Sequence, residues 1–285
     1  MSKVKGKAKK EVKEEFSIKI DNSRILKGIV ETLASIIDET EFRITPKEFT
    51  IKAMDPSRIC LLQLTIAKAN FEEFNCPKEC KIAMNLDDLD KIMKRSTIND
   101  TITLSYQEAD QKIKIKMIRD GTTRARTFSL ALLDIEVEDV PMDNLLKIEY
   151  PAEWSMDADL LVEAIKDAEI YSEILNIKTE ADKGLTFSSS GQIGEMEYDM
   201  ALDDLLESDF DGINTGAYSL TFLKAILKLI PITEALELSL KSDHPLKMIF
   251  NLLEGGVLSY FLAPRVEEAE FDDDDDVLEE LDGDD

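Results

Sequence analysis

Apolar and polar residues alternate along this chain in two successive blocks, and both blocks predict a similar series of elements. In the first block, a period of two predicts strands at residues 16–20, 42–44, 49–53, 59–67, 101–106, 112–118 and 126–132. A period near 3.6 predicts helices at 23–37 and 86–95. In the second block, the same patterns predict strands at 146–150, 174–179, 185–189, 195–201, 236–240, 246–252 and 257–262, and helices at 157–170 and 220–230.

The two blocks match at a nearly constant offset. Residues 86–106 overlay residues 220–240 at a shift of 134, and residues 49–66 overlay residues 185–202 at a shift of 136. Several segments in one order at nearly one offset indicate a duplication. The predicted fold class is therefore α+β, with two similar domains that each pack two helices on antiparallel sheets.

Composition and broken periodicity set the expected boundaries. Residues 1–14 carry six lysines and read as a flexible basic arm, followed by a first domain at 15–132. Residues 133–145 are acidic, contain Pro141 and follow neither period, which predicts a connector. A second domain is expected at 146–266, and residues 267–285 read as a disordered acidic tail.

The net charge of −26 argues against general attraction to a polyanion. Thirteen of the acidic residues lie in the tail, so the rest of the chain is still strongly negative. Binding to nucleic acid therefore requires basic residues gathered on one face. Basic residues recur on the predicted helices, at Lys27, Lys91, Lys94, Arg95, Lys166, Lys224 and Lys228. By pattern alone, these positions also fit ordinary solvated helix faces.

No catalytic pattern stands out. His244 is the only histidine, Cys60, Cys76 and Cys80 are too few for a disulfide framework, and no glycine-rich phosphate loop is present. We expect a non-enzyme with no metal or cofactor, a structural role for His244, and buried free thiols. No apolar run reaches the roughly 20 residues of a membrane span. An acidic scaffold or chaperone for basic partners is the function that the charge alone favours.

Three short motifs carry a resemblance to a known family. The runs MDPSRICL at 54–61, RTF at 126–128 and LAPRVEE at 262–268 resemble the proliferating cell nuclear antigen family of DNA sliding clamps, especially archaeal forms, and the resemblance extends over 15–268. It implies a cytoplasmic, non-catalytic processivity factor associated with chromosomal DNA. Three subunits would close head to tail into a pseudo-sixfold ring around double-stranded DNA, with helices and the seven basic residues facing the hole. Gly28, Glu163 and Thr221 stand where the family often has further basic residues.

The resemblance also implies a groove for partners. In the family, DNA polymerase, the clamp loader, flap endonuclease and DNA ligase insert a short PIP-type motif with aromatic anchors. The matching positions are Met54, Ile59, Leu61, Leu133, Val140, Pro141, Pro245, Phe261, Ala263 and Pro264. Arg58 stands where eukaryotic members have histidine.

Subunit contacts in the family pair an edge strand of the first domain with one of the second. The candidate positions are Lys112, Lys114, Lys116 and Ile118 on one side, and Glu195, Glu197 and Met200 on the other. Lysines 114 and 116 would then face the two glutamates. The sequence leaves open whether the ring is a homotrimer or a heterotrimer of related subunits.

Overall fold

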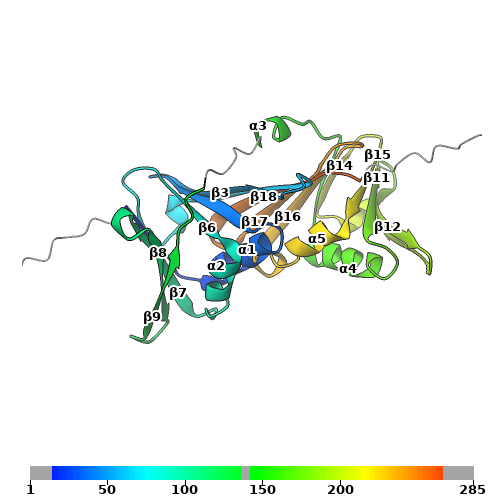
Figure 1. Ribbon diagram of the computed structural model, residues 1–285. Helices are drawn as coiled ribbons and strands as arrows, with labels where there is room; N and C mark the ends of the chain where they lie inside the picture. Colours follow the sequence, from blue (N-terminus) through cyan, green and yellow to red (C-terminus); the bar gives the residue numbers. More distant parts are fainter. Residues whose placement is uncertain (1–14, 136–141, 266–285) are drawn as a thin grey trace, which may run out of the picture.

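The computed structural model describes residues 15–135 and 142–265, and within them each half of the chain repeats one series of eleven helices and strands (Figure 1). The first half contains β1 (Phe16–Ile20), α1 (Ser23–Ala34), β2 (Glu39–Ile44), β3 (Glu48–Met54), β4 (Cys60–Ala67), β5 (Glu73–Asn75), β6 (Cys80–Asn85), α2 (Leu86–Met93), β7 (Asp100–Gln107), β8 (Lys112–Arg119) and β9 (Ala125–Ala131). The predicted basic arm, the acidic tail and part of the predicted connector lie outside the described residues.

The second half follows the same order. It contains β10 (Ala152–Met156), α4 (Ala158–Ala168), β11 (Ile174–Glu180), β12 (Gly184–Gly191), β13 (Gly194–Met200), β14 (Glu207–Phe210), β15 (Ile213–Ser219), α5 (Leu220–Ile226), β16 (Thr233–Leu240), β17 (Leu246–Leu252) and β18 (Gly256–Leu262). A short helix, α3 (Met142–Leu145), precedes it, and short 3-10 turns such as η1 (Lys68–Asn70), η4 (Ile230–Ile232) and η5 (Leu253–Gly255) connect other elements. The predicted duplicated α+β fold is confirmed.

The described strands form three sheets that reflect the duplication. The order β5-β1-β7-β8-β9 in a five-stranded sheet recurs as β14-β10-β16-β17-β18. In the second half this unit continues, because β18 pairs with β4 and joins β4-β3-β2-β6 into one nine-stranded sheet. The counterpart of that four-strand group, β13-β12-β11-β15, is a separate sheet. The two halves of one chain are thus fused through β18 and β4.

Helices α1, α2, α4 and α5 lie together on one side of the long sheet (Figure 1). Each of three helices begins at a residue whose side chain accepts a backbone N–H bond, namely Asn22 for α1, Asn85 for α2 and Asp157 for α4. The apolar face of α1, which includes Ile25, Ile29 and Leu33, is buried against the strands. The opposite faces of the helices therefore carry the polar residues.

The structure corrects several sequence-based boundaries. Residues 146–150 alternate like a strand but form none; the strand begins only at Ala152, after Pro151, and Leu146 continues the turn of α3 by donating its N–H to the Met142 carbonyl at 3.0 Å. The predicted helix at 220–230 ends as α5 at Ile226, and its last turn tightens into η4 around Pro231, which has no N–H to give to a helix. Strands β5, β6, β14 and β15 were missed. Among the described residues, no helix is long and apolar enough to cross a membrane.

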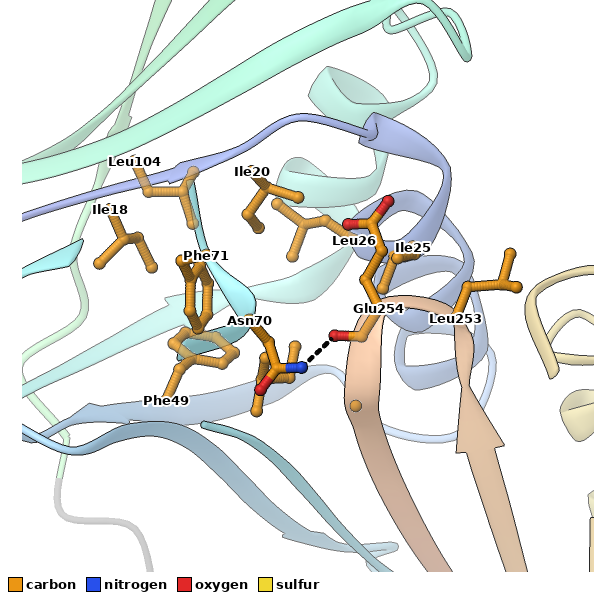
Figure 2. A pocket seen from close by; sticks show the side chains of 12 residues that line it. Ile18, Ile20, Ile25, Leu26, Phe49, Asn70, Phe71, Leu104, Leu253 and Glu254 are labelled. Carbon is orange, nitrogen blue, oxygen red and sulfur yellow. Dashed lines mark hydrogen bonds between the residues drawn. The ribbon is translucent and has the colours of Figure 1, made fainter. Parts of the chain in front are cut away.

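A small cavity lies at one end of the first-half core, where a hairpin of the second half closes it (Figure 2). Its volume is about 20 Å³, which leaves room for roughly one water molecule. The side chain of Asn70 donates to the Glu254 carbonyl at 2.7 Å and so ties η1 to the turn between β17 and β18. Glu254 and Gly255 both have positive φ, and they lie in the three-residue loop between the paired residues Leu252 and Gly256.

We expect Gly255→Ala to lower the free energy of unfolding by about 2 kcal/mol, measured by denaturant unfolding. A Cβ at position 255 would lie 1.9 Å from the Asn70 Nδ2, so Asn70 must move and lose its hydrogen bond. The matched control is Gly212→Ala, because Gly212 also has positive φ but its Cβ would meet nothing within 4 Å. Equal losses for the two variants would show that the Asn70 contact contributes nothing.

Candidate functional site

The basic residues singled out in the sequence lie on or just after the four helices that share one side of the long sheet (Figure 1). Lys27 is on α1, Lys91 on α2, Lys166 on α4 and Lys224 on α5. Lys94 is the C-cap of α2, with Arg95 next, and Lys228 follows the last residue of α5 by two positions. The fold therefore gathers cations from both halves on one helical surface.

Many of these cations are paired with carboxylates of the same surface. Lys91 contacts Asp88 at 2.9 Å and Lys94 contacts Asp90 at 2.6 Å, both within α2. Lys224 pairs with Glu169, and Lys228 pairs with Glu31 at 2.6 Å. Across residues 15–135 and 142–265, Lys27, Arg95 and Lys166 make no ion pair, so they carry the uncompensated positive charge of the set. Sequence reasoning missed Glu31 and Glu169, because each lies far along the chain from its lysine.

A second small apolar cluster lies on the other side of the sheet from these helices. Leu61, Phe261 and Met142 are buried together, and Met54 and Leu145 pack against them. Helix α3, which supplies Met142 and Leu145, lies across the sheet from α1, α2, α4 and α5 (Figure 1). Met142 and Leu145 were not singled out in the sequence, although both are apolar residues of the predicted connector.

The loop beside this cluster is shaped by one buried carboxylate. The side chain of Asp55 accepts backbone N–H bonds from Ser57 at 2.9 Å, Ile59 at 2.7 Å and Cys60 at 2.5 Å. These bonds fold the segment between β3 and β4 into a tight turn that leaves the Ile59 side chain 37% exposed. The Ala263 N–H donates to the Ile59 carbonyl at 2.8 Å, so the end of β18 lies against the same turn.

The remaining groove candidates divide into three groups. Pro245, Ala263 and Pro264 are half-buried near the end of β18, and the Pro245 carbonyl accepts a bond from the Tyr150 hydroxyl at 2.9 Å. Leu133 lies instead at the far edge of the long sheet, where it bridges to Ala83 on β6. Three strands separate β6 from β18, so Leu133 lies away from the other groove candidates. Val140 and Pro141 lie outside the described residues.

The expected first-domain edge strand needs a correction. Lys112, Lys114, Lys116 and Ile118 belong to β8, which pairs with β7 on one side and β9 on the other. A strand with both edges occupied offers no backbone groups to another subunit, so the assignment of these residues to an edge was wrong. Among the described strands, β5 and β9 are the outer strands of that sheet, and β9 is the one beside β8. In the second half, Glu195, Glu197 and Met200 lie on β13, which is an edge strand.

The cysteines and the histidine lie apart from the two surfaces described above or are buried within the fold. The three cysteines are free and buried, as expected, and burial raises the pKa of Cys60 to about 12 and that of Cys80 to about 11. Both groups therefore stay protonated thiols at neutral pH. His244 sits in the turn before β17 with its Nδ1 2.8 Å from the Ser242 carbonyl. Among the residues that the structure describes, no three His, Cys, Asp or Glu side chains are arranged to hold a metal ion.

Comparison with known proteins accounts for both halves of the chain. The family model described as "Proliferating cell nuclear antigen, N-terminal domain" matches residues 15–140, and the corresponding C-terminal domain matches residues 144–265. Two similar curated proteins are each described as a DNA polymerase sliding clamp. The one from Thermofilum pendens is 33% identical over 86% of this chain and 97% of its own length, and the one from Thermococcus gammatolerans is 30% identical over 89% and 99%.

A solved structure shows the same architecture. The crystal structure of the PCNA2-PCNA3 complex from Sulfolobus tokodaii contains a chain that aligns with a TM-score of 0.79 and 27% identity, over 88% of this chain and all of that one. With both domain models matched and the curated relatives covered almost completely, the protein belongs to the proliferating cell nuclear antigen family of DNA polymerase sliding clamps.

Proposed function

We propose that copies of this chain, or this chain with related subunits, close into a three-membered ring that encircles duplex DNA and tethers a polymerase to it. The observation that carries the proposal is the sheet order. Inside one chain, β18 pairs with β4, whereas among the described strands their counterparts β9 and β13 each lie at the edge of a sheet. Pairing β9 of one subunit with β13 of the next would repeat, between subunits, the β18–β4 pairing found inside one chain, which we call the internal junction. Such a head-to-tail contact produces a closed ring when its rotation closes.

The internal junction also predicts which residues would lie opposite each other in the proposed β9–β13 contact. In the β18–β4 pair, Tyr260 lies opposite Leu62, and both are fully buried. By the strand pairings within each half, β9 residue Phe128 corresponds to Tyr260, and β13 residue Met196 corresponds to Leu62. Phe128 and Met196 are only partly buried in the single chain. Assembly in this register would place them opposite each other and bury them as their counterparts are buried.

The helical surface is the proposed DNA-facing side. Its cations come from all four helices, while the rest of the molecule supplies most of a net charge of −26. Phosphate contacts carry no sequence information, and a few weak ones hold a duplex without fixing its position. Lys27, Arg95 and Lys166 are the proposed principal contacts, because they make no ion pair within residues 15–135 and 142–265. The paired residues Lys91, Lys94, Lys224 and Lys228 would contribute less.

The apolar cluster under α3 is the proposed docking site for partner proteins. Met54, Ile59, Leu61, Phe261, Pro245, Ala263 and Pro264 surround the turn held by Asp55, on the face away from the helices. Partly exposed apolar side chains beside a buried apolar cluster can pack against an aromatic side chain of a short peptide. Polymerase, clamp loader, flap endonuclease and ligase are the proposed clients. We add Met142 and Leu145 to the proposed groove and remove Leu133 from it.

Retention on circular DNA tests this function directly. Loaded by its ATP-driven loader onto a closed circle, the clamp is expected to stay bound through gel filtration and to leave once the circle is cut. A Lys27→Ala/Lys166→Ala variant should assemble normally and stimulate a polymerase less, because its DNA-facing surface has lost two unpaired cations per subunit. The matched control is Lys112→Ala/Lys116→Ala, which removes the same charge from exposed positions of the central strand β8. Equal retention on closed and cut circles would contradict the proposed function.

A further inference from the structure

Helix α1 lies unusually close to the segment that follows α5. A Cβ built on Gly28 would lie 2.9 Å from Cδ1 of Ile232 and 3.4 Å from the Lys228 carbonyl oxygen. The absence of a side chain at position 28 thus lets the backbone of α1 approach this segment of the other half. One turn later on α1, Oε1 of Glu31 lies 2.6 Å from Nζ of Lys228, although the two residues are 197 positions apart in the sequence.

Glu31 lies near lysines from three segments of the chain. Besides its bond to Lys228, its carboxylate lies in the field of Lys94 at the end of α2 and Lys27 on α1. The hydrogen bond from Lys228, with smaller electrostatic contributions from Lys228, Lys94 and Lys27, holds the pKa of Glu31 below its usual range. The carboxylate is therefore an anion that bonds to Lys228 and shares one face of α1 with Lys27, which lies four residues earlier.

This contact differs from the two ion pairs of α2. The Lys91–Asp88 and Lys94–Asp90 pairs join neighbouring turns of a single helix, with lysine side chains that are 72% and 56% exposed. Such local pairs contribute little and rearrange easily. The Glu31 side chain is only 30% exposed and bonds to a lysine from the other half of the chain. A phosphate oxygen has the same charge sign and the same need for N–H donors as this carboxylate.

We propose that Glu31 occupies a phosphate-binding position formed by Lys27, Lys94 and Lys228, and that it competes with the DNA backbone for these lysines. The inference rests on the proposed function, since it requires the helical surface to face DNA. Glu31 then limits how tightly the clamp holds a duplex. When a phosphate enters, the carboxylate gives up Lys228, and part of the binding free energy is used to break the ion pair.

Glu31→Gln tests the proposal, because glutamine keeps the size of glutamate and removes its charge. The assembled variant should bind a blunt 30-base-pair duplex more tightly than the wild type at low salt, and its affinity should fall more steeply with salt. Each added phosphate contact steepens the logarithmic salt slope by about 0.9, which is about 3.5-fold more loss of affinity between 50 and 200 mM salt. Adding Lys228→Ala to Glu31→Gln should remove most of the gain.

The matched control is Glu237→Gln, which makes the same charge change on β16, at an exposed carboxylate that accepts a bond from Asn251 at 2.7 Å. It should leave duplex affinity and salt slope unchanged. An equal gain in this control would assign the effect to net charge and overturn the proposal. Unchanged or weaker binding by both Glu31→Gln and a second variant, Glu31→Ala, would also overturn it. Wild-type clamp that fails to stay on closed circles would instead contradict the proposed function, so the two failures are distinguishable.

Discussion

Replacing Phe128 with aspartate is expected to leave the chain monomeric at concentrations where the wild type is assembled. Phe128 lies on the free edge strand β9, on the face that packs toward the core, and it is partly buried even in the single chain. Its counterpart in the internal junction, Tyr260, is completely buried. A charge at a position that becomes buried between subunits costs several kcal/mol unless it is paired. We expect the dissociation constant for assembly to rise by about 100-fold or more.

Native mass measurement and sedimentation across a concentration series would follow this change. Far-ultraviolet circular dichroism should show that the monomeric variant keeps the wild-type fold, because Phe128 lies at an edge of its sheet. Lys116→Glu is the control, since Lys116 lies on the central strand β8 and its charge reversal is larger. If Lys116→Glu breaks the assembly and Phe128→Asp does not, the β9–β13 contact is wrong and the strand first inferred from the sequence is the interface.

The choice between β8 and β9 marks a limit of sequence periodicity. In β8, Ile113, Ile115 and Met117 alternate with lysines, and this pattern correctly predicts a strand with one buried face. Alternation reports which face of a strand is buried, but it does not report whether the backbone edges are paired. That property depends on the order of strands in the sheet, which is set by contacts between distant segments. Once the internal β18–β4 pair is known, the duplication indicates that the counterparts of these two strands, β9 and β13, can pair in the same way.

The charge of the helical surface could be predicted only in part from the sequence, because some of its ion pairs join residues that are far apart along the chain. Lysines at helical spacing are visible in the sequence, and the structure places all seven basic positions on or beside the four helices. Their ion-pair partners are visible only when they lie one turn away, as Asp90 does from Lys94. The partners of Lys224 and Lys228 come from other helices, 55 and 197 residues away. Charge counting along the chain therefore overstated how much free positive charge this surface carries.

The proposed partner groove includes the turn between β3 and β4, and the local sequence explains why this turn forms. Aspartate followed by proline and serine favours a turn in which the side chain accepts backbone N–H bonds, and Asp55 does this with three donors. What the sequence did not reveal is that Leu133 continues along β6 instead of crossing to β18. A single backbone bond, from the Leu133 N–H to the Ala83 carbonyl at 2.9 Å, fixes that path.

Replacing Ile59 with glutamate is expected to abolish binding of client peptides with little effect on stability. The side chain is 37% exposed, and the backbone groups of Ile59, not its side chain, hold the turn by bonding to Asp55 and Ala263. Stability should therefore change by less than about 0.5 kcal/mol. A carboxylate at the proposed anchor position must lose its water when an aromatic ring docks, so peptide affinity should fall about 30-fold or more. Calorimetric titration with a peptide carrying paired aromatic residues would measure this change.

Val257→Glu is the matched control for that measurement. Val257 is 40% exposed and lies on β18, four residues before Phe261 and therefore on the same face of the strand but outside the cluster. The control should bind the peptide like the wild type, and both variants should remain assembled and be retained on closed circles. Equal loss of binding in the two variants would point to general charge repulsion by an already acidic protein. Full binding by Ile59→Glu would contradict the proposed client site, because Ile59 is the exposed apolar side chain of this turn.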